Sequence, residues 1–154
     1  MKYISKGVKD THKIAKNILK DLILRPKNSQ ALVVILKGEL GAGKTEFVKG
    51  LKSFLEIKNN ILSPTFVLMK VYNILNTKFK KMYHFDLYRL LEGKLKEKNI
   101  IEALETLNIY DILNDNTNIV FIEWGENLKM LKKYNPIVIE IINTKNAERK
   151  ILIS

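Results

Sequence analysis

Residues 31–45 read Ala31-Leu-Val-Val-Ile-Leu-Lys-Gly-Glu-Leu-Gly-Ala-Gly-Lys-Thr45. Within them, Gly38 to Thr45 match in full the pattern G-x-x-x-x-G-K-S/T of a phosphate-binding loop. The apolar, β-branched run before the loop is typical of a buried strand, and the periodicity of residues 46–56 predicts a helix after it. Strand, loop and helix in this order are the setting that the motif requires. The stretch therefore predicts a nucleotide-binding site in an α/β domain.

Each fixed position of the loop has its own chemical task. The glycines let the backbone bend until successive N–H groups point into one concavity, which cradles phosphate oxygens. Lys44 is placed to reach the β- and γ-phosphates, and the Thr45 hydroxyl to meet Mg²⁺. The following helix adds the positive end of its dipole. The residues that we expect to bind the nucleotide in and beside the loop are Glu39, Leu40, Gly41, Ala42, Gly43, Lys44, Thr45 and Glu46.

Length and composition are those of one cytoplasmic domain. A chain of 154 residues can bury a sizeable core, so we expect residues 1–154 to form a single domain. The chain has no cysteine, which excludes disulfides and thiolate-held metals, and only two histidines, His12 and His84. No apolar run approaches the ~20 residues that cross a bilayer, and the first residues lack a signal-peptide core. We therefore expect a soluble cytoplasmic protein with no membrane association.

The net charge of +11 permits a nucleic-acid ligand, but the sequence pattern does not favour one. Nearly all the positive charge is lysine, and the arginines are only Arg25, Arg89 and Arg149. The lysines are scattered along expected helix faces, as in residues 94–98, and form no dense tract. A solvated basic surface is the simpler interpretation. Weak electrostatic steering towards an acidic partner or RNA is the alternative.

The rest of the chain predicts a mixed α/β fold. Strand-like runs lie at residues 2–5, 65–72, 81–87, 118–123, 136–142 and 149–153, and helical periodicity lies at residues 11–25, 96–113 and 126–134. Asp10 or Thr11 is expected to cap the first helix, which should end before Pro26. Short connections at 73–78 and 143–147 indicate two antiparallel hairpins. We expect one mixed sheet flanked by helices, as in nucleotide hydrolases with this loop.

A phosphate-binding loop needs an acid at the end of a neighbouring strand, which holds Mg²⁺ or orients the attacking water. Asp86 ends the run Met82-Tyr-His-Phe-Asp86, and Glu123 ends the run Ile119-Val-Phe-Ile-Glu123. Ligands of open α/β sheets bind at the carboxyl ends of the strands. We therefore expect both acids at the catalytic and metal site together with Thr45. Which acid contacts the metal directly stays open.

Four blocks of the chain together resemble the TsaE (YjeE) family, the small bacterial ATPases of tRNA threonylcarbamoyladenosine synthesis. These blocks are Gly38-Glu-Leu-Gly-Ala-Gly-Lys-Thr45, Ser63-Pro-Thr-Phe66, His84-Phe-Asp-Leu-Tyr-Arg-Leu90 and Ile122-Glu-Trp124. Their order and spacing match the family over essentially the whole chain. Thr11, which follows an acid and opens an expected helix, is similar to an N-terminal Glu-Thr element of the family.

The resemblance implies a role for each matching residue. Lys44 resembles the phosphate-binding lysine, Asp86 the acid needed for ATP turnover, and Glu123 the second acid at the Mg²⁺ site. Residues 63–65, which include Thr65, resemble a switch-type loop that senses the γ-phosphate. Further residues that the resemblance places at or near the nucleotide are Thr11 and Trp124, with Arg89 and Arg149 as weaker candidates.

The same resemblance implies ATP and Mg²⁺ as cofactors and the TsaB–TsaD heterodimer as partner. The TsaD subunit of that pair transfers a threonylcarbamoyl group to the adenosine that follows the anticodon. ATP binding and hydrolysis by this chain would drive or reset the assembly, with tRNA contacted only indirectly or weakly.

Glu46 departs from the family, which usually has a second threonine after the loop threonine. An acid in the first turn of a helix is favourable by roughly 0.3–1 kcal/mol. A carboxylate ~6 Å from a phosphate costs about 3 kcal/mol per unit charge at an effective dielectric constant of ~20, and under ~1 kcal/mol when it is solvated. Nucleotide binding should therefore survive with Glu46 pointing outward, at reduced affinity.

Three other functions fit parts of the sequence. A small nucleoside or nucleotide kinase usually needs several arginines to clamp the transferred phosphoryl group, and this chain has three. A regulatory GTPase needs an N/T-K-x-D element, but Ala147 stands where its aspartate would fall. A nucleotide-gated binding module with negligible ATPase of its own is close to the family interpretation, because a partner-dependent ATPase looks inert alone.

Overall fold

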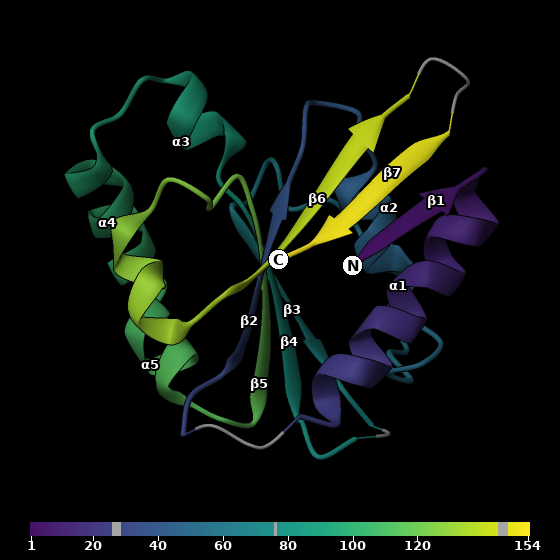
Figure 1. The fold of residues 1–154 in the computed structure, drawn as a ribbon. Coiled ribbons are helices and arrows are strands. Elements are labelled where there is room, and N and C mark those ends of the chain that lie inside the picture. The colour runs from purple at the N-terminus through teal and green to yellow at the C-terminus, as the bar shows by residue number, and fades with distance from the viewer. Residues whose placement is uncertain (26–28, 76, 145–147) are drawn as a thin grey trace.

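A seven-stranded mixed sheet forms the centre of the computed structural model, which describes residues 1–25, 29–75, 77–144 and 148–154 (Figure 1). The strands are β1 (Lys2–Ser5), β2 (Leu32–Lys37), β3 (Met69–Asn73), β4 (Lys81–Asp86), β5 (Asn118–Glu123), β6 (Ile137–Asn143) and β7 (Arg149–Ile153). Their spatial order is β1-β7-β6-β2-β5-β4-β3. The central strands β6, β2, β5 and β4 are parallel, whereas β3, β7 and β1 join antiparallel at the two edges.

Helices cover both faces of the sheet (Figure 1). They are α1 (Val8–Ile23), α2 (Lys44–Lys49), α3 (Tyr88–Glu92), α4 (Glu97–Glu105), α5 (Ile109–Asn114) and the 3₁₀ helix η1 (Lys129–Tyr134). Along β2, Val34 and Leu36 pack in the core with α1 and α2, whereas Val33 and Ile35 pack in the core with α4 and α5. The apolar run of β2 is thus explained by burial on both faces.

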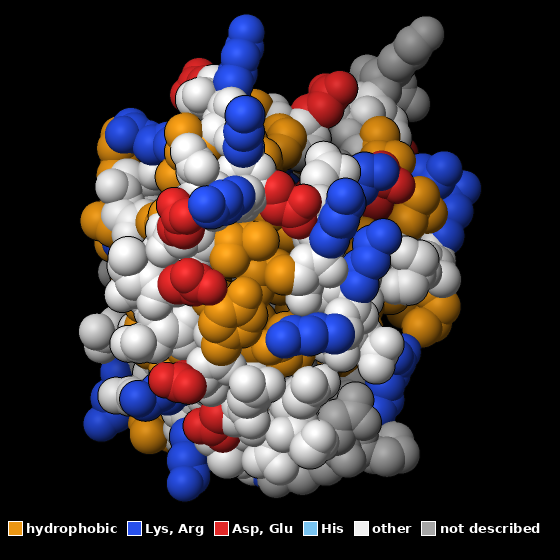
Figure 2. Space-filling model, turned by 90° about the vertical axis from the view of Figure 1, so that its left-hand side faces the viewer, with side chains coloured by type: hydrophobic (Ala, Val, Ile, Leu, Met, Phe, Trp, Pro, Cys, Tyr) orange, Lys and Arg blue, Asp and Glu red, His pale blue; other side chains and the backbone are white. Residues whose placement is uncertain are grey.

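Figure 2 shows the side that carries α4 and α5, where acidic and basic side chains are mixed around a central hydrophobic area. No helix in the described residues is long and apolar enough to span a bilayer.

The predicted fold class is confirmed: the chain is one α/β domain with a mixed sheet, flanking helices and two antiparallel hairpins. All of the predicted strands are present. The strand predicted from residue 65 begins only at Met69, because a turn joins the Val67 N–H to the Pro64 carbonyl and Leu68 has a φ of 65°. The predicted turn at 143–147 includes residues 145–147, which lie outside the described residues, as does Pro26.

The helices differ more from prediction than the strands do. The cap predicted at Asp10 or Thr11 is wrong: α1 begins at Val8 after Gly7, and Asp10 instead accepts a hydrogen bond from the Lys6 N–H at 3.1 Å. The helix predicted for 46–56 is regular only to Lys49, after which the backbone hydrogen bonds span three residues at Leu51 and Lys52, four at Leu55 and five at Ile57.

Two further helix predictions need correction. The single helix predicted for residues 96–113 is two helices, α4 and α5, separated at Asn108. Asn108 has a left-handed φ of 56°, a conformation that asparagine adopts more readily than most residues do. The helix predicted for residues 126–134 is the 3₁₀ helix η1, and Asn135 ends it just before Pro136. α3 was not predicted.

Candidate functional site

The carboxyl ends of three neighbouring parallel strands meet at one edge of the sheet. Leu36 of β2 pairs with Glu123 of β5, and Glu123 pairs with Asp86 of β4. The phosphate-binding loop leaves β2 at this same edge and leads into α2. The strand register therefore brings both predicted acids beside the loop, although they are 37 positions apart in sequence.

Two glycines of the loop have structural reasons to be glycine. Gly38 has a φ of 151°, and a Cβ there would overlap the carbonyl of Ile141 on β6. Gly43 has a φ of 103°, and a Cβ there would lie 2.8 Å from Nε of Arg149. That Nε donates a hydrogen bond to the Ala42 carbonyl at 3.1 Å. Arg149 of β7 thus holds the loop from outside, and its contact with nucleotide stays a prediction.

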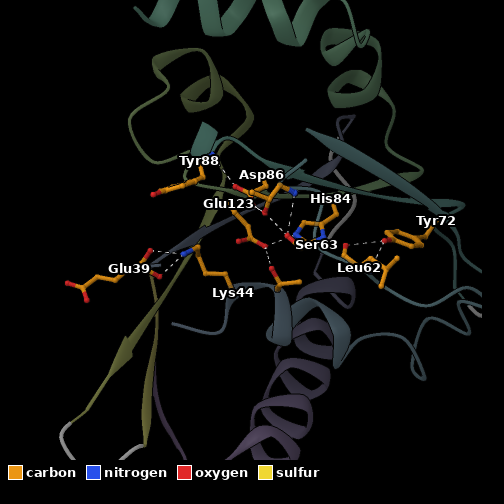
Figure 3. Close-up of polar contacts among 12 residues, drawn as sticks. Glu39, Lys44, Leu62, Ser63, Tyr72, His84, Asp86, Tyr88 and Glu123 are labelled. Atoms are coloured by element: carbon orange, nitrogen blue, oxygen red, sulfur yellow. Dashed lines mark hydrogen bonds and ion pairs between the residues drawn. The ribbon is translucent and has the colours of Figure 1, made fainter. Parts of the chain in front are cut away.

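Lys44 is folded back into the loop (Figure 3). Its Nζ donates to the carbonyls of Gly38 at 2.7 Å and Glu39 at 2.9 Å, and it lies 4.1 Å from the centre of the Trp124 ring. Burial lowers the pKa of the ammonium group, while the carboxylates of Glu123 and Asp86 oppose that shift. The ammonium is held by two neutral carbonyls and a ring face, all of which a phosphate could replace.

Glu123 links the loop to the core of the sheet (Figure 3). Its Oε1 accepts a hydrogen bond from the Thr45 hydroxyl at 2.8 Å. The same oxygen lies 2.8 Å from Nε2 of His84, a side chain of β4 that is completely buried. An ionised carboxylate can only accept, so Nε2 carries the hydrogen of this bond. The two contacts fix the Glu123 side chain beside the first turn of α2.

Asp86 is held by the Thr65 side chain and by the backbone of Tyr88. One of its oxygens accepts from the Thr65 hydroxyl, and the other accepts from the backbone N–H of Tyr88 at 3.0 Å. The Thr65 hydroxyl also lies 2.6 Å from the hydroxyl of Ser63. The predicted switch-type loop is therefore tied to the predicted catalytic acid by side-chain hydrogen bonds.

A cavity of about 380 Å³ lies between these groups. Its lining consists of Val8, Leu40, Gly41, Gly43, Lys44, Thr45, Glu46, Ser63, Thr65, Asp86, Tyr88, Glu123, Trp124 and Arg149. Most of the residues predicted to contact nucleotide or metal are in this set. Glu39, Ala42 and Thr11 are not: Thr11 is fully buried, and its hydroxyl lies 2.8 Å from Ser5 Oγ and 3.2 Å from the Gly7 carbonyl. The contacts of all the predicted residues with nucleotide or metal stay predictions.

The comparisons with known proteins assign the chain to a family. The family model described as "Threonylcarbamoyl adenosine biosynthesis protein TsaE" matches residues 5–151. The chain belongs to the TsaE family. TsaE membership also agrees with the predicted resemblance, which used the loop, the two strand-end acids and the segment at 63–66.

Relatives with curated names support the same assignment. The tRNA threonylcarbamoyladenosine biosynthesis protein TsaE of Haemophilus influenzae is 38% identical over 106 residues, which are 69% of this chain and 60% of that protein. The protein of the same name in Rickettsia felis is 36% identical over 133 residues, 86% of this chain and 66% of that protein. The matched part of this chain thus spans well under the full length of these relatives.

A solved structure shows the same fold. The crystal structure of YdiB from Bacillus subtilis aligns with a TM-score of 0.64 and 25% sequence identity. The alignment covers 98% of this chain and 82% of YdiB. This TsaE-family chain and YdiB therefore share an overall fold.

Glu46, the departure from the TsaE pattern, has partners of its own. One carboxylate oxygen lies 2.7 Å from Nε2 of His12, and the other accepts from Nζ of Lys49 at 3.1 Å. Burial raises the pKa of Glu46, but the hydrogen bonds from His12 and Lys49 outweigh burial, and the pKa lies below its usual value. Glu46 also lines the cavity, and the two contacts of its carboxylate offset part of its charge.

The oxygen atoms at the site fit a magnesium ion. Mg²⁺ prefers hard oxygen ligands and is usually bound by one or two carboxylates together with substrate phosphates. Thr45, Glu123 and Asp86 supply such oxygens around one cavity. The described residues contain no cluster of three or more His, Cys, Asp or Glu side chains that could hold a metal by themselves. A metal at this position would therefore depend on the phosphates of a bound nucleotide.

His84, Tyr88 and Val8 were not among the predicted site residues, and Val8 lines the cavity from the start of α1. His84 and Tyr88 flank Asp86 in sequence and were part of the TsaE-like block at 84–90, but no role was assigned to them. His84 alternates with Asp86 along β4, a spacing that places both on one face of the strand. That spacing was the available signal, and only the register with β5 shows that His84 reaches Glu123.

Proposed function

We propose that this TsaE-family chain binds and hydrolyses MgATP and thereby supports the TsaB–TsaD pair in forming N6-threonylcarbamoyladenosine next to the tRNA anticodon. Family membership supports a part in threonylcarbamoyladenosine biosynthesis. The observation that carries the ATPase proposal is the cavity in which Lys44, Thr45, Asp86 and Glu123 converge. The partner pair and the cytoplasmic location are proposed from the family resemblance.

Phosphate binding begins with Lys44 in this proposal. Its Nζ leaves the carbonyls of Gly38 and Glu39 and turns to the phosphates, where a charge-assisted bond is stronger than a bond to a neutral carbonyl. The backbone N–H groups of the loop cradle the phosphate oxygens, and Arg149 keeps the loop in place through the Ala42 carbonyl.

Metal binding requires Thr45 and Glu123 to exchange partners. In the structure the Thr45 hydroxyl donates to Glu123, so both oxygens already lie close together on one side of the cavity. His84 steadies the Glu123 carboxylate from the buried side. Mg²⁺ supplies charge neutralisation between the phosphates at such a site. Without it, the carboxylates of Asp86 and Glu123 repel a polyphosphate, so nucleotide binding should depend strongly on Mg²⁺.

Hydrolysis is assigned to Asp86 and the loop that holds it. When Thr65 turns from Asp86 to the γ-phosphate, one carboxylate oxygen becomes free to accept a hydrogen bond from a water molecule. Tyr88 N–H retains the other oxygen and fixes its direction. Asp86 can then orient or deprotonate the attacking water, as such acids do in phosphoryl transfer.

Steady-state ATP turnover with Mg²⁺, in the presence of the TsaB–TsaD pair, tests this assignment. Lys44→Ala should abolish turnover and weaken binding, because it removes the phosphate cation. Asp86→Ala should mainly lower turnover, and Glu123→Ala should raise the Mg²⁺ concentration needed for half-maximal activity. Glu140→Gln is the matched control, because Glu140 of β6 forms an ion pair with Lys37 of β2 and is absent from the cavity lining.

Two results would contradict the proposal. If Asp86→Ala turns over ATP at the wild-type rate, its assigned role is wrong. If the purified chain transfers phosphate efficiently to a nucleoside, a kinase function replaces the proposed one.

A further inference from the structure

Helix α1 carries a row of four lysines on one face. Lys9, Lys13, Lys16 and Lys20 follow the i, i+4, i+7, i+11 spacing that places side chains one above another on a helix. The row is about 16 Å long at the rise of an α-helix. Like charges at i, i+4 destabilise a helix by about 0.2–0.5 kcal/mol per pair. The four lysines thus lower the stability of α1, and the fold of the helix does not require them.

The fold sets more lysines opposite this row. Gly50, just after α2, lies so close to α1 that a Cβ there would come within 3.0 Å of the Cβ of His12. The close approach forms a groove of about 700 Å³ between α1 and the segment after α2, on the side of the molecule where Figure 1 shows α1. Its lining consists of His12, Lys13, Lys16, Lys49, Gly50, Lys52, Ser53, Glu56, Ile57 and Lys58.

The groove is basic and lacks an exposed apolar anchor. Among its lining residues five are lysines and one, Glu56, is acidic. Ile57, the large aliphatic side chain of the lining, is buried. The opposite face of the molecule, over α4 and α5, mixes both signs of charge around a hydrophobic area (Figure 2). The fold thus brings five lysines that lie apart in the sequence together on the α1 side.

We propose that this groove binds the phosphate backbone of RNA. Lysines bind phosphates as point charges without reading sequence, and a row of about 16 Å reaches several successive phosphates of one strand. An acidic protein is a poorer fit, because the buried centre of a protein interface is apolar and rich in aromatic side chains, and this groove offers none of them exposed.

The groove and the nucleotide cavity share a border at Glu46. Glu46 lines the cavity, and its carboxylate contacts His12 and Lys49, which line the groove. The RNA groove is nevertheless separate from the phosphate-binding loop, so RNA binding does not rest on the proposed ATPase activity.

Titration of the full chain with a fluorescently labelled tRNA transcript, at several NaCl concentrations, tests the proposal. The variant combines Lys13→Gln, Lys16→Gln and Lys52→Gln. Its matched control combines Lys94→Gln, Lys96→Gln and Lys98→Gln, three exposed lysines near α4 that change the net charge equally. We expect the groove variant to bind about tenfold or more weakly, with a slope of log affinity against log salt reduced by about 2 to 3. The control variant should keep the wild-type affinity and slope.

Several outcomes would overturn the proposal. The first is that the wild type does not bind tRNA at low salt. The second is that both triple variants lose the same amount of tRNA affinity. The third is that polyglutamate binds as tightly as tRNA and depends on the groove lysines, which would indicate an acidic protein ligand. Lys44→Ala should bind tRNA as the wild type does, and a parallel loss there would place RNA at the nucleotide cavity instead. Circular dichroism of each variant shows whether a loss of binding follows from misfolding, and single substitutions Lys13→Gln and Lys52→Gln then replace the triple variant.

Discussion

At the scale of single residues, Glu46 shows how a change in sequence is absorbed by its neighbours. A bare carboxylate in the first turn after the phosphate-binding loop would repel a nucleotide. His12 of α1 and Lys49 of α2 contact its two oxygens, at 2.7 and 3.1 Å, and offset part of its charge. Glu46 should therefore weaken nucleotide binding by less than the Coulomb repulsion alone suggests.

Replacing Glu46 by threonine should tighten nucleotide binding. Glu46→Thr removes the remaining repulsion and restores the hydroxyl that relatives usually have, so we expect affinity for ADP to rise by up to roughly tenfold, or about 1.4 kcal/mol. Titration with MgADP followed by Trp124 fluorescence measures it, because the Lys44 ammonium lies over that ring and should leave it on binding. Equal affinities of the two proteins would contradict this account.

The same carboxylate predicts a pH dependence of stability. The pKa of Glu46 is lower in the folded chain than its ordinary value of 4.5, so the ionised form stabilises the fold. This contribution is complete above the unfolded-state value and is lost as pH falls through the folded-state pKa. Urea unfolding should therefore show wild type more stable than Glu46→Gln at neutral pH, with a gap that shrinks below 4.5. A gap independent of pH would exclude an electrostatic role.

The residues that could be predicted from sequence are those whose chemistry is fixed by a motif. Lys44 and Thr45 follow from the loop pattern, and Asp86 and Glu123 follow from their positions at strand ends. His84 could not be assigned, because its contact with Glu123 depends on the register of β4 against β5. The partners of Glu46 likewise depend on how closely α1 approaches α2.

At the scale of elements, the loop between β2 and α2 is held by β7 as well as by its own glycines. Gly41 and Gly43 both have left-handed φ values, of 77° and 103°. They differ in surroundings: a Cβ at Gly41 meets nothing within 4 Å, whereas a Cβ at Gly43 meets Arg149. Alanine substitutions at the two positions therefore separate the effect of backbone strain from the effect of a steric collision.

Gly43→Ala should cost more stability than Gly41→Ala. Each substitution places a Cβ on a left-handed residue, at about 1–2 kcal/mol, and only Gly43→Ala also displaces Arg149 from the Ala42 carbonyl. Urea unfolding and MgADP titration of both variants measure the difference. Arg149→Ala in the Gly43→Ala background should relieve the collision, and no improvement in that double variant would contradict the proposed contact.

The strands were predictable because their apolar runs are short, β-branched and bounded by turn residues. The helices were less so, because their limits follow from backbone conformation rather than from periodicity. Residues 96–113 keep a helical pattern through Asn108, and only its left-handed conformation separates α4 from α5. Residues 50–56 retain apolar spacing, but the approach of Gly50 to His12 accompanies a tighter, irregular turn.

At the scale of the whole molecule, the fold sets the candidate nucleotide site and the basic groove next to each other. Because β2 lies between β5 and β6 and β4 lies beyond β5, the loop and both acids meet at one edge of the sheet. Because α1 and α2 share one layer, the lysines of both gather in a groove next to that edge. Charge composition alone could not show this, because the row on α1 is completed by residues after α2.

The most direct test of the central claim is the ATP-dependent modification of a tRNA transcript by reconstituted TsaB–TsaD with this chain added. We expect repeated rounds of threonylcarbamoyladenosine formation with the wild-type chain and MgATP, and a loss of repeated rounds with Lys44→Ala or Asp86→Ala. Repeated modification at the same rate without this chain, or with Asp86→Ala in its place, would contradict the account.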